Sequence, residues 1–326
     1  MSMHVVLENS NQTFPGHFIL LGLSNILYLQ VVFFLLLLML YMVTLSGNIL
    51  LVCMVRFNPR LQTPMYFFLA NLAIIDICFS STVVPKILVN TISPDRSISF
   101  LGCATQLYFH LALGGTECLI LAAMAFDRYN AICKPLQYNM IMNHKLCLRL
   151  AAVSWTLNFL LAVILTMVTF DLPYCKANQI NHFFCEMPPM LHLSCADIWF
   201  SVVVECTLVV LVVAGSFLLI LISYFFITLT ILNITSTKQR QKAFSTCASH
   251  LAVVLLFYGT ALFMHLRPPS SYFPEQDKIV SVFYTVVTPV MNPIIYSIRN
   301  KEIKAAIRKS MAVKDITNLF FLSTNR

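Results

Sequence analysis

The sequence predicts an all-α membrane protein, a seven-transmembrane helix bundle with a short interfacial helix after the seventh span. Hydrophobic residues make up 59% of the 326 residues and charged residues only 10%, whereas a soluble domain carries about 25% charged residues. Apolar runs long enough to cross a bilayer, roughly 20 residues each, occur seven times. We place these spans near residues 26–54, 64–88, 100–126, 147–169, 199–231, 243–265 and 276–298.

The spans divide the chain into an N-terminal tail (residues 1–25), the bundle (residues 26–298) and a C-terminal segment (residues 299–326). No basic residue precedes the first span, so we expect a signal anchor and not a cleaved signal peptide. The alternating pattern of a β-barrel is absent. After Asn300, apolar residues recur at helical spacing opposite basic residues, which predicts a short interfacial helix on the anionic inner leaflet.

The basic residues predict the orientation. Five of the 21 Lys and Arg residues fall on the side of the N-terminal tail and sixteen on the other side. The positive-inside rule therefore places the N-terminus outside the cell and the C-terminal segment in the cytoplasm, in a multi-pass protein of the plasma membrane. The net charge of +8 follows from this topology and gives no reason to expect nucleic acid. Asn11 begins a glycosylation sequon in the outer tail.

Four of the eleven cysteines, Cys103, Cys175, Cys185 and Cys195, lie on the predicted outer side, where disulfides persist. Four cysteines allow three pairings, and the sequence alone does not choose among them. His182, Cys185 and Glu186 have a spacing that could ligate a metal. A cysteine in a disulfide offers no thiolate, so we expect no metal there.

A charged pair, Asp127-Arg128, ends the third apolar stretch and must lie at a membrane boundary, because burial in hydrocarbon costs several kcal/mol. The pair has two interpretations. It is either a solvated helix end or a switch, in which Asp127 holds Arg128 until a partner protein competes for it. Lys242 and His250 near the start of the sixth span indicate a surface that meets water or a protein.

Two acids lie within the predicted spans, Asp76 in the second and Glu117 in the third. Glu117 is ten residues before Asp127, about 15 Å along a helix, and Asp76 has a similar depth in its own span. If both face inward, like charges at short range must share a proton or a cation such as Na⁺. The alternative is that one acid is protonated and structural. The predicted site comprises Asn48, Asp76, Glu117 and Asn292.

Asp127-Arg128-Tyr129 and Asn292-Pro293-Ile-Ile-Tyr296 resemble the ends of spans three and seven in rhodopsin-like G-protein-coupled receptors. Further stretches are similar to the tetrapod-type odorant receptors, from the first span to the end of the seventh. They are Pro64-Met-Tyr-Phe-Phe-Leu69, Met124 to Tyr129 with Ala131-Ile-Cys133, His182 to Pro189, Ser223-Tyr224, Lys242 to Cys247 and Pro289 to Asn300. Phe126 and Asn130 depart from the family pattern, and Asn130 puts the strength of coupling in question.

The resemblance implies two disulfides, Cys103–Cys185 and Cys175–Cys195, and no catalytic activity. It also implies coupling to a stimulatory G protein of the olfactory type, which raises cyclic AMP. The residues that match the family's G-protein switch are Asp127, Arg128, Tyr129, Tyr224, Lys242, Asn292, Pro293 and Tyr296.

In the family the ligand lies in the outer half of the bundle, between spans three, five, six and seven. The positions that match here are mostly apolar, as expected for a pocket that removes small hydrophobic molecules from water. Gly114 and Gly115 either leave room for ligand or allow helix contact. The expected ligand-binding residues are Leu107, His110, Leu111, Gly114, Gly115, Glu205, Leu208, Val212, Tyr258, Ala261, Leu262, His265, Val282 and Thr285.

We expect a neutral odorant with a hydrogen-bonding group, and His110 and His265 could each contact it. Glu205 is the only candidate anchor for an amine on these spans, unless it pairs with His265 or faces water. Activation would be a population shift, in which ligand contact near Tyr258 favours outward movement of the sixth span and frees Arg128. A transporter is a rival reading, but the inverted repeats typical of transporters are absent, as are the motifs of common enzymes.

Overall fold

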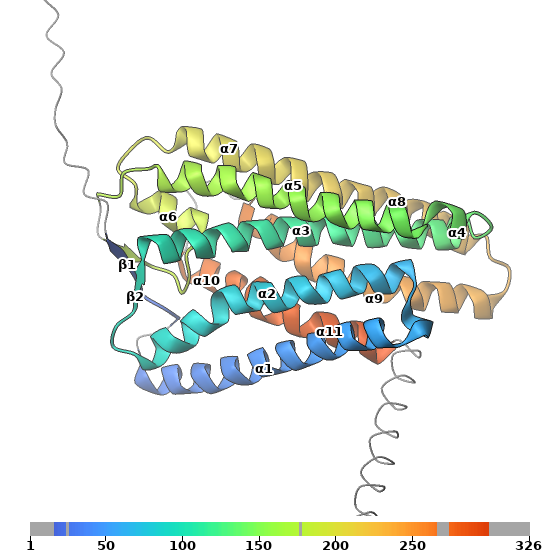
Figure 1. Ribbon diagram of the computed structural model, residues 1–326, viewed down its shortest axis with the longest axis horizontal. Coiled ribbons are helices and arrows are strands. Elements are labelled where there is room, and N and C mark those ends of the chain that lie inside the picture. Colours follow the sequence, from blue (N-terminus) through green and yellow to red (C-terminus); the bar gives the residue numbers. More distant parts are fainter. Residues whose placement is uncertain (1–15, 24–25, 176–177, 266–273, 300–326) are drawn as a thin grey trace, which may run out of the picture.

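The computed structural model describes residues 16–23, 26–175, 178–265 and 274–299. It contains seven helices long and apolar enough to cross a membrane, which confirms the predicted bundle (Figure 1). The predicted interfacial helix and the Asn11 sequon lie outside the described residues. The spans are α1 (Leu27–Phe57), α2 (Pro64–Ile92), α3 (Phe100–Cys133), α5 (His144–Phe170), α7 (Trp199–Val209) with η2 (Val210–Ala214) and α8 (Gly215–Leu232), α9 (Thr237–His265), and α10 (Pro274–Val282) with η4 (Phe283–Val287) and α11 (Thr288–Arg299).

A small sheet lies at one end of the bundle, which we call the sheet end. Strand β1 (His17–Leu20) pairs with β2 (Ser97–Ser99) antiparallel and with β3 (Gln179–Ile180) parallel. The sequence did not predict these strands, and β1 belongs to the predicted tail. Such short strands leave little periodicity to detect, and β1 is held by burial of Phe18 and Leu20 at the loops.

The starts of α2, α3 and α5 carry local sequence signals. The Ser99 side chain accepts a hydrogen bond from the Gly102 amide at 3.0 Å, and Asn143 accepts one from Leu146 at 3.0 Å, so each caps the first turn of its helix. Pro64 occupies the first turn of α2, where no backbone donor is lost. Helices α3 and α9 extend beyond the predicted spans at 126 and 243, because a helix can continue past the apolar segment that the bilayer requires. The short elements η1 (Pro59–Leu61), α4 (Tyr138–Ile141) and α6 (Met187–Leu193) lie between spans.

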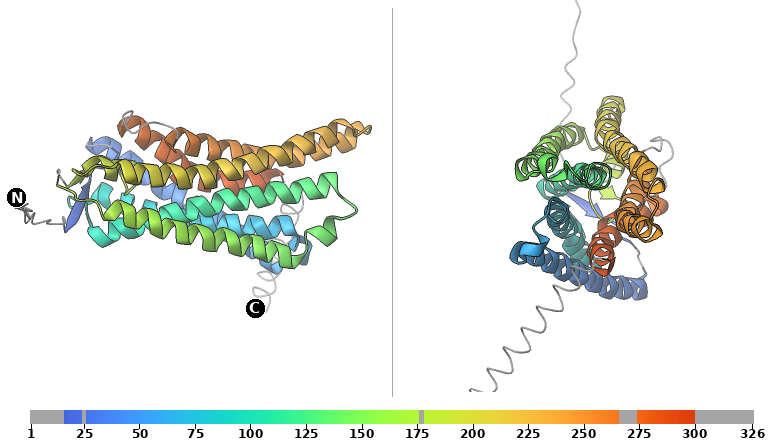
Figure 2. Two further views of the ribbon diagram at one scale, coloured as in Figure 1. Left: turned by 90° about the horizontal axis from the view of Figure 1, so that it is seen from above. Right: turned by 90° about the vertical axis from the view of Figure 1, so that its right-hand side faces the viewer.

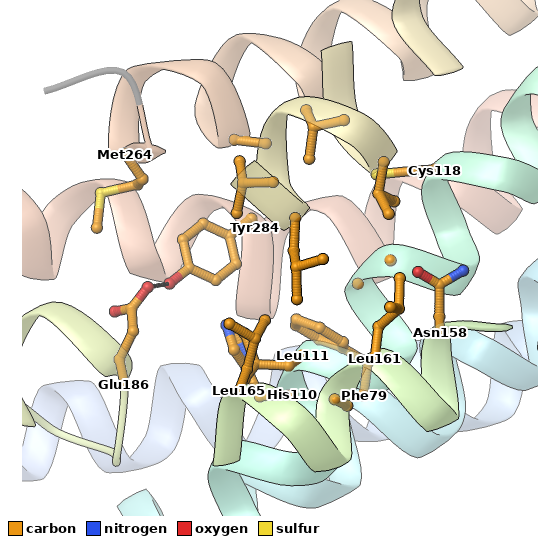
Figure 3. Close-up of a pocket in the computed structure, with 18 of the residues that line it drawn as sticks. Phe79, His110, Leu111, Cys118, Asn158, Leu161, Leu165, Glu186, Met264 and Tyr284 are labelled. Carbon is orange, nitrogen blue, oxygen red and sulfur yellow. Dashed lines mark hydrogen bonds between the residues drawn. The ribbon is translucent and has the colours of Figure 1, made fainter. Parts of the chain in front are cut away.

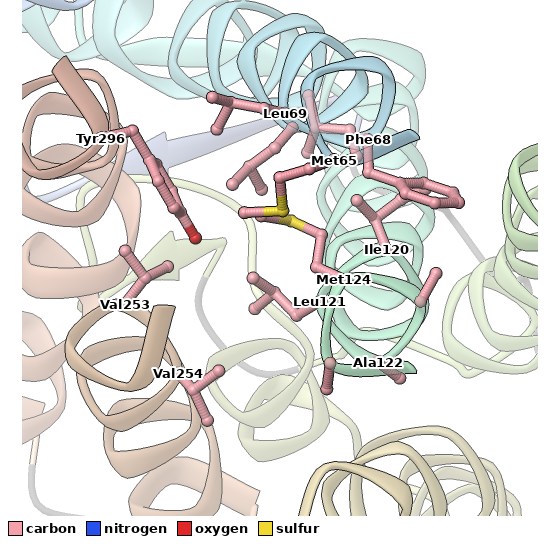
Figure 4. Close-up of a cluster of buried hydrophobic side chains, with 14 of the residues drawn as sticks. Met65, Phe68, Leu69, Ile120, Leu121, Ala122, Met124, Val253, Val254 and Tyr296 are labelled. Carbon is pink, nitrogen blue, oxygen red and sulfur yellow. The ribbon is translucent and has the colours of Figure 1, made fainter. Parts of the chain in front are cut away.

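Helix α3 lies inside the ring of helices (Figure 2) and packs against α2, α5 and α8. Ile120, Leu121 and Met124 of α3 are fully buried. They share one cluster with residues of α2 and with Val253 and Val254 of α9 (Figure 4). The outer faces are also apolar: Leu35 is 60% exposed on α1. An apolar surface this extensive requires lipid as its solvent.

The long segment between α5 and α7 is fastened over the sheet end by two disulfides. Cys103 of α3 is bonded to Cys185, and Cys175 is bonded to Cys195, which are the pairings that the resemblance implies. The Cys103–Cys185 bond fixes residues 182–186 next to the sheet end of α3. It therefore places a loop segment over the interior of the bundle.

Candidate functional site

A cavity of about 100 Å³ lies between the helices in the half of the bundle nearer the sheet end. A cavity of this order holds a small organic ring. Its walls are mostly aliphatic and aromatic, with a few polar groups (Figure 3). The lining residues are Phe79, His110, Leu111, Gly114, Gly115, Cys118, Asn158, Leu161, Ala162, Leu165, Glu186, Leu208, Val209, Val212, Val213, Phe257, Ala261, Met264 and Tyr284.

The structure brings half of the expected ligand-binding residues to this cavity. These are His110, Leu111, Gly114, Gly115, Leu208, Val212 and Ala261. Glu205, Leu262 and Thr285 are not on its wall, and Thr285 donates to the Ser281 carbonyl instead. Leu107 and Val282 pack in clusters with loop residues. His265 ends α9, and its side chain is outside the described part of the chain.

The wall from α5 is the largest part of the cavity that sequence reasoning missed. Asn158, Leu161, Ala162 and Leu165 all line it. Gly115 was the one sequence signal for this wall, because it allows α3 to approach α5 closely. A Cβ at this position would lie 2.2 Å from Asn158 Oδ1. Gly115 thus permits close contact between α3 and α5. A Cβ on Gly114 would meet only Phe79 Cε2, at 3.8 Å.

Tyr258 lies just beyond the cavity and links three helices. Its hydroxyl lies 2.7 Å from Ser216 Oγ of α8 and 3.1 Å from the Cys118 carbonyl oxygen of α3. Cys118 also lines the cavity. A ligand that presses on this wall therefore acts close to the contact between α3 and α9.

The sheet-end side of the cavity is polar. Glu186 accepts hydrogen bonds from Tyr284 and, at 3.1 Å, from Ser281. His182 Nε2 lies 3.6 Å from Glu186 Oε2. Burial, reinforced by repulsion from Lys278, lowers the pKa of His182 to about 3, so this histidine is neutral at pH 7. The proximity of His182 and Glu186 is therefore not an ion pair.

His110 lies in an aromatic enclosure, with ring centroids 5.1 Å from Phe79, 5.1 Å from Phe184 and 5.6 Å from Tyr284. Cys185 is bonded to Cys103 and so has no thiolate to offer a metal. Within the described ranges, no group of three His, Cys, Asp or Glu residues is placed to hold a metal ion.

The predicted intramembrane cluster is partly assembled. The Asn292 amide donates to Asp76 Oδ1 and Oδ2 at 3.0 and 3.1 Å, and Asn48 donates to the Pro289 carbonyl at 3.1 Å. Glu117 is buried on α3 and interacts electrostatically with Asp76. The cluster therefore joins α2, α3 and α11 in the interior, on the side of the cavity away from the sheet end.

At the opposite end of the bundle, Asp127 is held by a residue that the sequence analysis did not include. Tyr138 of α4 donates to Asp127 Oδ1 at 2.8 Å. In the part of the chain that the structure describes, no ion pair joins Asp127 to Arg128, and Arg128 Nε has no hydrogen-bond partner. Asp127 and Arg128 therefore interact electrostatically without the direct contact that the restraint hypothesis assumes.

Tyr224 and His250 form a second buried pair near Arg128. The Tyr224 hydroxyl lies 2.8 Å from His250 Nδ1, and His250 is completely buried. The expectation that His250 faces water or a protein was wrong, because its ring is enclosed between α8 and α9. Tyr296 is also buried, Tyr129 packs on Phe226, Pro293 lies within α11, and the Lys242 side chain is outside the described residues.

Seven membrane-spanning helices with an apolar cavity near one end and an Asp-Arg-Tyr segment at the other define a membrane receptor for a small molecule. The chain belongs to the olfactory receptor family, whose profile matches residues 37–314. These receptors bind odorants and couple to G proteins, and the family is not enzymatic.

Similar proteins align over nearly the whole chain. Olfactory receptor 5AP2 of Mus musculus is 49% identical over 303 residues, which cover 93% of this chain and 96% of the relative. Olfactory receptor 5I1 of Homo sapiens is 49% identical over 304 residues, covering 93% and 97%. Olfactory receptor-like protein OLF1 of Canis lupus familiaris is 48% identical over 306 residues, covering 94% and 98%.

Proposed function

We propose that this odorant receptor binds a small, mostly apolar volatile molecule in the cavity and activates a stimulatory G protein of the olfactory type, which raises cyclic AMP. The observation that carries the proposal is the cavity between the helices with mostly apolar walls. Removing apolar surface from water contributes about 25 cal/mol per Å². A neutral volatile compound with few polar atoms therefore suits this site.

The route from the cavity to the G protein runs through α9. Tyr258 couples α9 to Cys118 at the cavity wall, and the same helix carries His250, which is bonded to Tyr224. A ligand that favours an arrangement with α9 swung outward shifts the population toward it, by as much as it prefers that arrangement. Arg128 would then meet the G protein, with the buried Tyr224 and Tyr296 turning toward it in support.

The orientation that fits this route places the sheet end outside the cell and the N-terminus with it, in the plasma membrane. The excess of Lys and Arg on the other side supports this topology. The two disulfides at the sheet end are consistent with an oxidising exterior. We also propose that the buried Asp76 and Glu117 share a proton or a Na⁺ ion.

The test is ligand-evoked cyclic AMP in cells that display the receptor, screened with a panel of volatile compounds. Arg128→Ala is expected to abolish the response while surface expression is kept. Arg149→Ala is the matched control, because Arg149 is exposed on α5 near the same end. A normal cyclic AMP response from Arg128→Ala contradicts the proposed role of this arginine.

A further inference from the structure

One cavity residue comes from a loop and carries a carboxylate. Glu186 follows Cys185 directly, is only 4% exposed, and reaches the cavity wall beside Tyr284 (Figure 3). The cavity is otherwise mostly apolar, and the amide of Asn158 lies toward its other end. A buried carboxylate at one end of an apolar cavity determines which polar group a ligand can present there.

The Glu186 carboxylate is held in place before any ligand arrives. Ser281 Oγ donates to Oε2 at 3.1 Å, and the Tyr284 hydroxyl donates to Oε1. The backbone on its N-terminal side is fixed too, because Cys185 is disulfide-bonded to Cys103 and its amide donates to Gln106 Oε1 at 2.9 Å. A group held this way does not lose side-chain freedom on binding, which favours affinity.

Three titratable side chains, those of His182, Lys278 and His110, lie in the same part of the structure as Glu186. His182 is neutral at pH 7, and its distance of 3.6 Å is too long for a hydrogen bond. The Lys278 ammonium donates to Glu275 Oε1 at 3.0 Å. His110 faces Tyr284 through ring contact. A carboxylate has about four lone-pair sites, and Ser281 and Tyr284 each donate to a different one of its two oxygens.

We infer that Glu186 is the polar anchor of the cavity, so that the receptor favours small apolar molecules with a terminal hydrogen-bond donor, an alcohol or an amine, over molecules of the same skeleton with acceptors only. This inference rests on the proposed function. Glu186 takes the place of Glu205 as the acid that contacts the ligand, because Glu205 does not line the cavity. Hydrogen bonds to a charged acceptor are roughly twice as strong as neutral ones.

The experiment compares alcohols, primary amines and methyl ethers of matched carbon skeletons by their half-maximal concentrations in the cyclic AMP assay. In the native receptor, alcohols or amines should be more potent than the matched ethers by about 10-fold or more. Glu186→Gln keeps the size of the side chain and an acceptor oxygen but removes the charge. It should reduce this advantage to within about 3-fold. Asp171→Asn, an exposed acid in the same segment, should leave it unchanged.

The native receptor alone gives a test that does not depend on folding of a variant. Methyl ethers or ketones as potent as the matched alcohols and amines overturn the inference, and so does an unchanged advantage in Glu186→Gln. Tyr284→Phe keeps the ring and removes a donor to Glu186, so the advantage of donors should persist. Its loss in Tyr284→Phe would assign the anchor to the tyrosine. If no volatile compound activates the displayed native receptor, the proposed function fails and the inference with it.

Discussion

Gly115 determines how closely α3 can approach α5 beside the cavity. A Cβ added here would lie 2.2 Å from Asn158 Oδ1 and 2.8 Å from its Cγ, whereas a Cβ on Gly114 would make an ordinary contact of 3.8 Å. Asn158 is not free to move away without a cost, because its amide donates to the Ser154 carbonyl at 2.9 Å. Two adjacent glycines therefore differ sharply in what they tolerate.

Gly115→Ala should destabilise the receptor by about 1–3 kcal/mol, the usual cost of overpacking, and Gly114→Ala should be nearly neutral. Thermal unfolding of the purified receptor in detergent measures both. Asn158→Ala in the Gly115→Ala background removes the atoms that clash and should recover part of the loss. A Gly115→Ala protein as stable as the native one would show that α3 and α5 do not pack this closely.

His182 should make stability depend on pH. Its pKa is lowered by burial to about 3, whereas an unfolded histidine titrates near pH 6.5. Between about pH 6.5 and 3 the unfolded chain binds a proton at His182 and the folded chain does not. The contribution of neutral His182 to the free energy of unfolding is therefore fully present above about pH 6.5 and is lost as the pH falls toward 3. The loss should approach roughly 1 kcal/mol per pH unit.

The measurement is the melting temperature between pH 7.5 and 5.5 for the native receptor, for His182→Gln and for His144→Gln. His182→Gln cannot take up the proton and should make the dependence less steep. His144 is exposed at the start of α5, so its replacement should leave the dependence as it is. Equal slopes in all three proteins would mean that His182 is not the group responsible.

At the scale of the elements, the helices could be predicted from the sequence and their packing could not. Each span is an apolar run of bilayer length, which one segment reveals by itself. The cavity wall from α5 depends on the angle at which α3 and α5 cross. In the sequence, only Gly115 indicates that these two helices approach closely. The strand β1 is too short for a period, and the place of Glu186 depends on a disulfide and a folded loop.

Helix α5 should control the size of ligand that the cavity accepts. Leu161 lines the cavity, and Leu161→Ala removes three carbon atoms from its wall. Small agonists lose contact area with the wall, worth about 25 cal/mol per Å², whereas bulkier agonists can fill the new space. Bulkier agonists should therefore gain potency relative to small ones. Leu160→Ala is the control on the same helix, because Leu160 is 66% exposed on the outer face. An unchanged order of agonists in Leu161→Ala would exclude α5 from the binding site.

Across the whole molecule, polar groups follow one another from the cavity to the Arg128 end. Glu186 and Tyr284 lie at the sheet-end side of the cavity, and Tyr258 and the pair of Asp76 with Asn292 lie on the side away from the sheet end. Each of these groups joins at least two segments that are distant in the sequence. Buried polar contacts in hydrocarbon surroundings must find partners within the bundle, so they fix which helix arrangements are allowed.

The shared ion or proton at Asp76 and Glu117 leads to a prediction about the whole bundle, because this cluster ties α2, α3 and α11 together. If Na⁺ is held there, replacing choline chloride by NaCl at constant ionic strength should raise the melting temperature of the native receptor. The stabilisation would be about 1–3 kcal/mol at 10 to 100 times the dissociation constant. Asp76→Asn and Glu117→Gln should abolish it, and Glu275→Gln, in an exposed acid, should not. If a proton is shared instead, Na⁺ should not change the melting temperature of the native receptor. Each of the two variants should then differ from the native receptor in how its stability depends on pH between pH 6 and 8. Two variants that match the native receptor in both tests would show that the acids act separately.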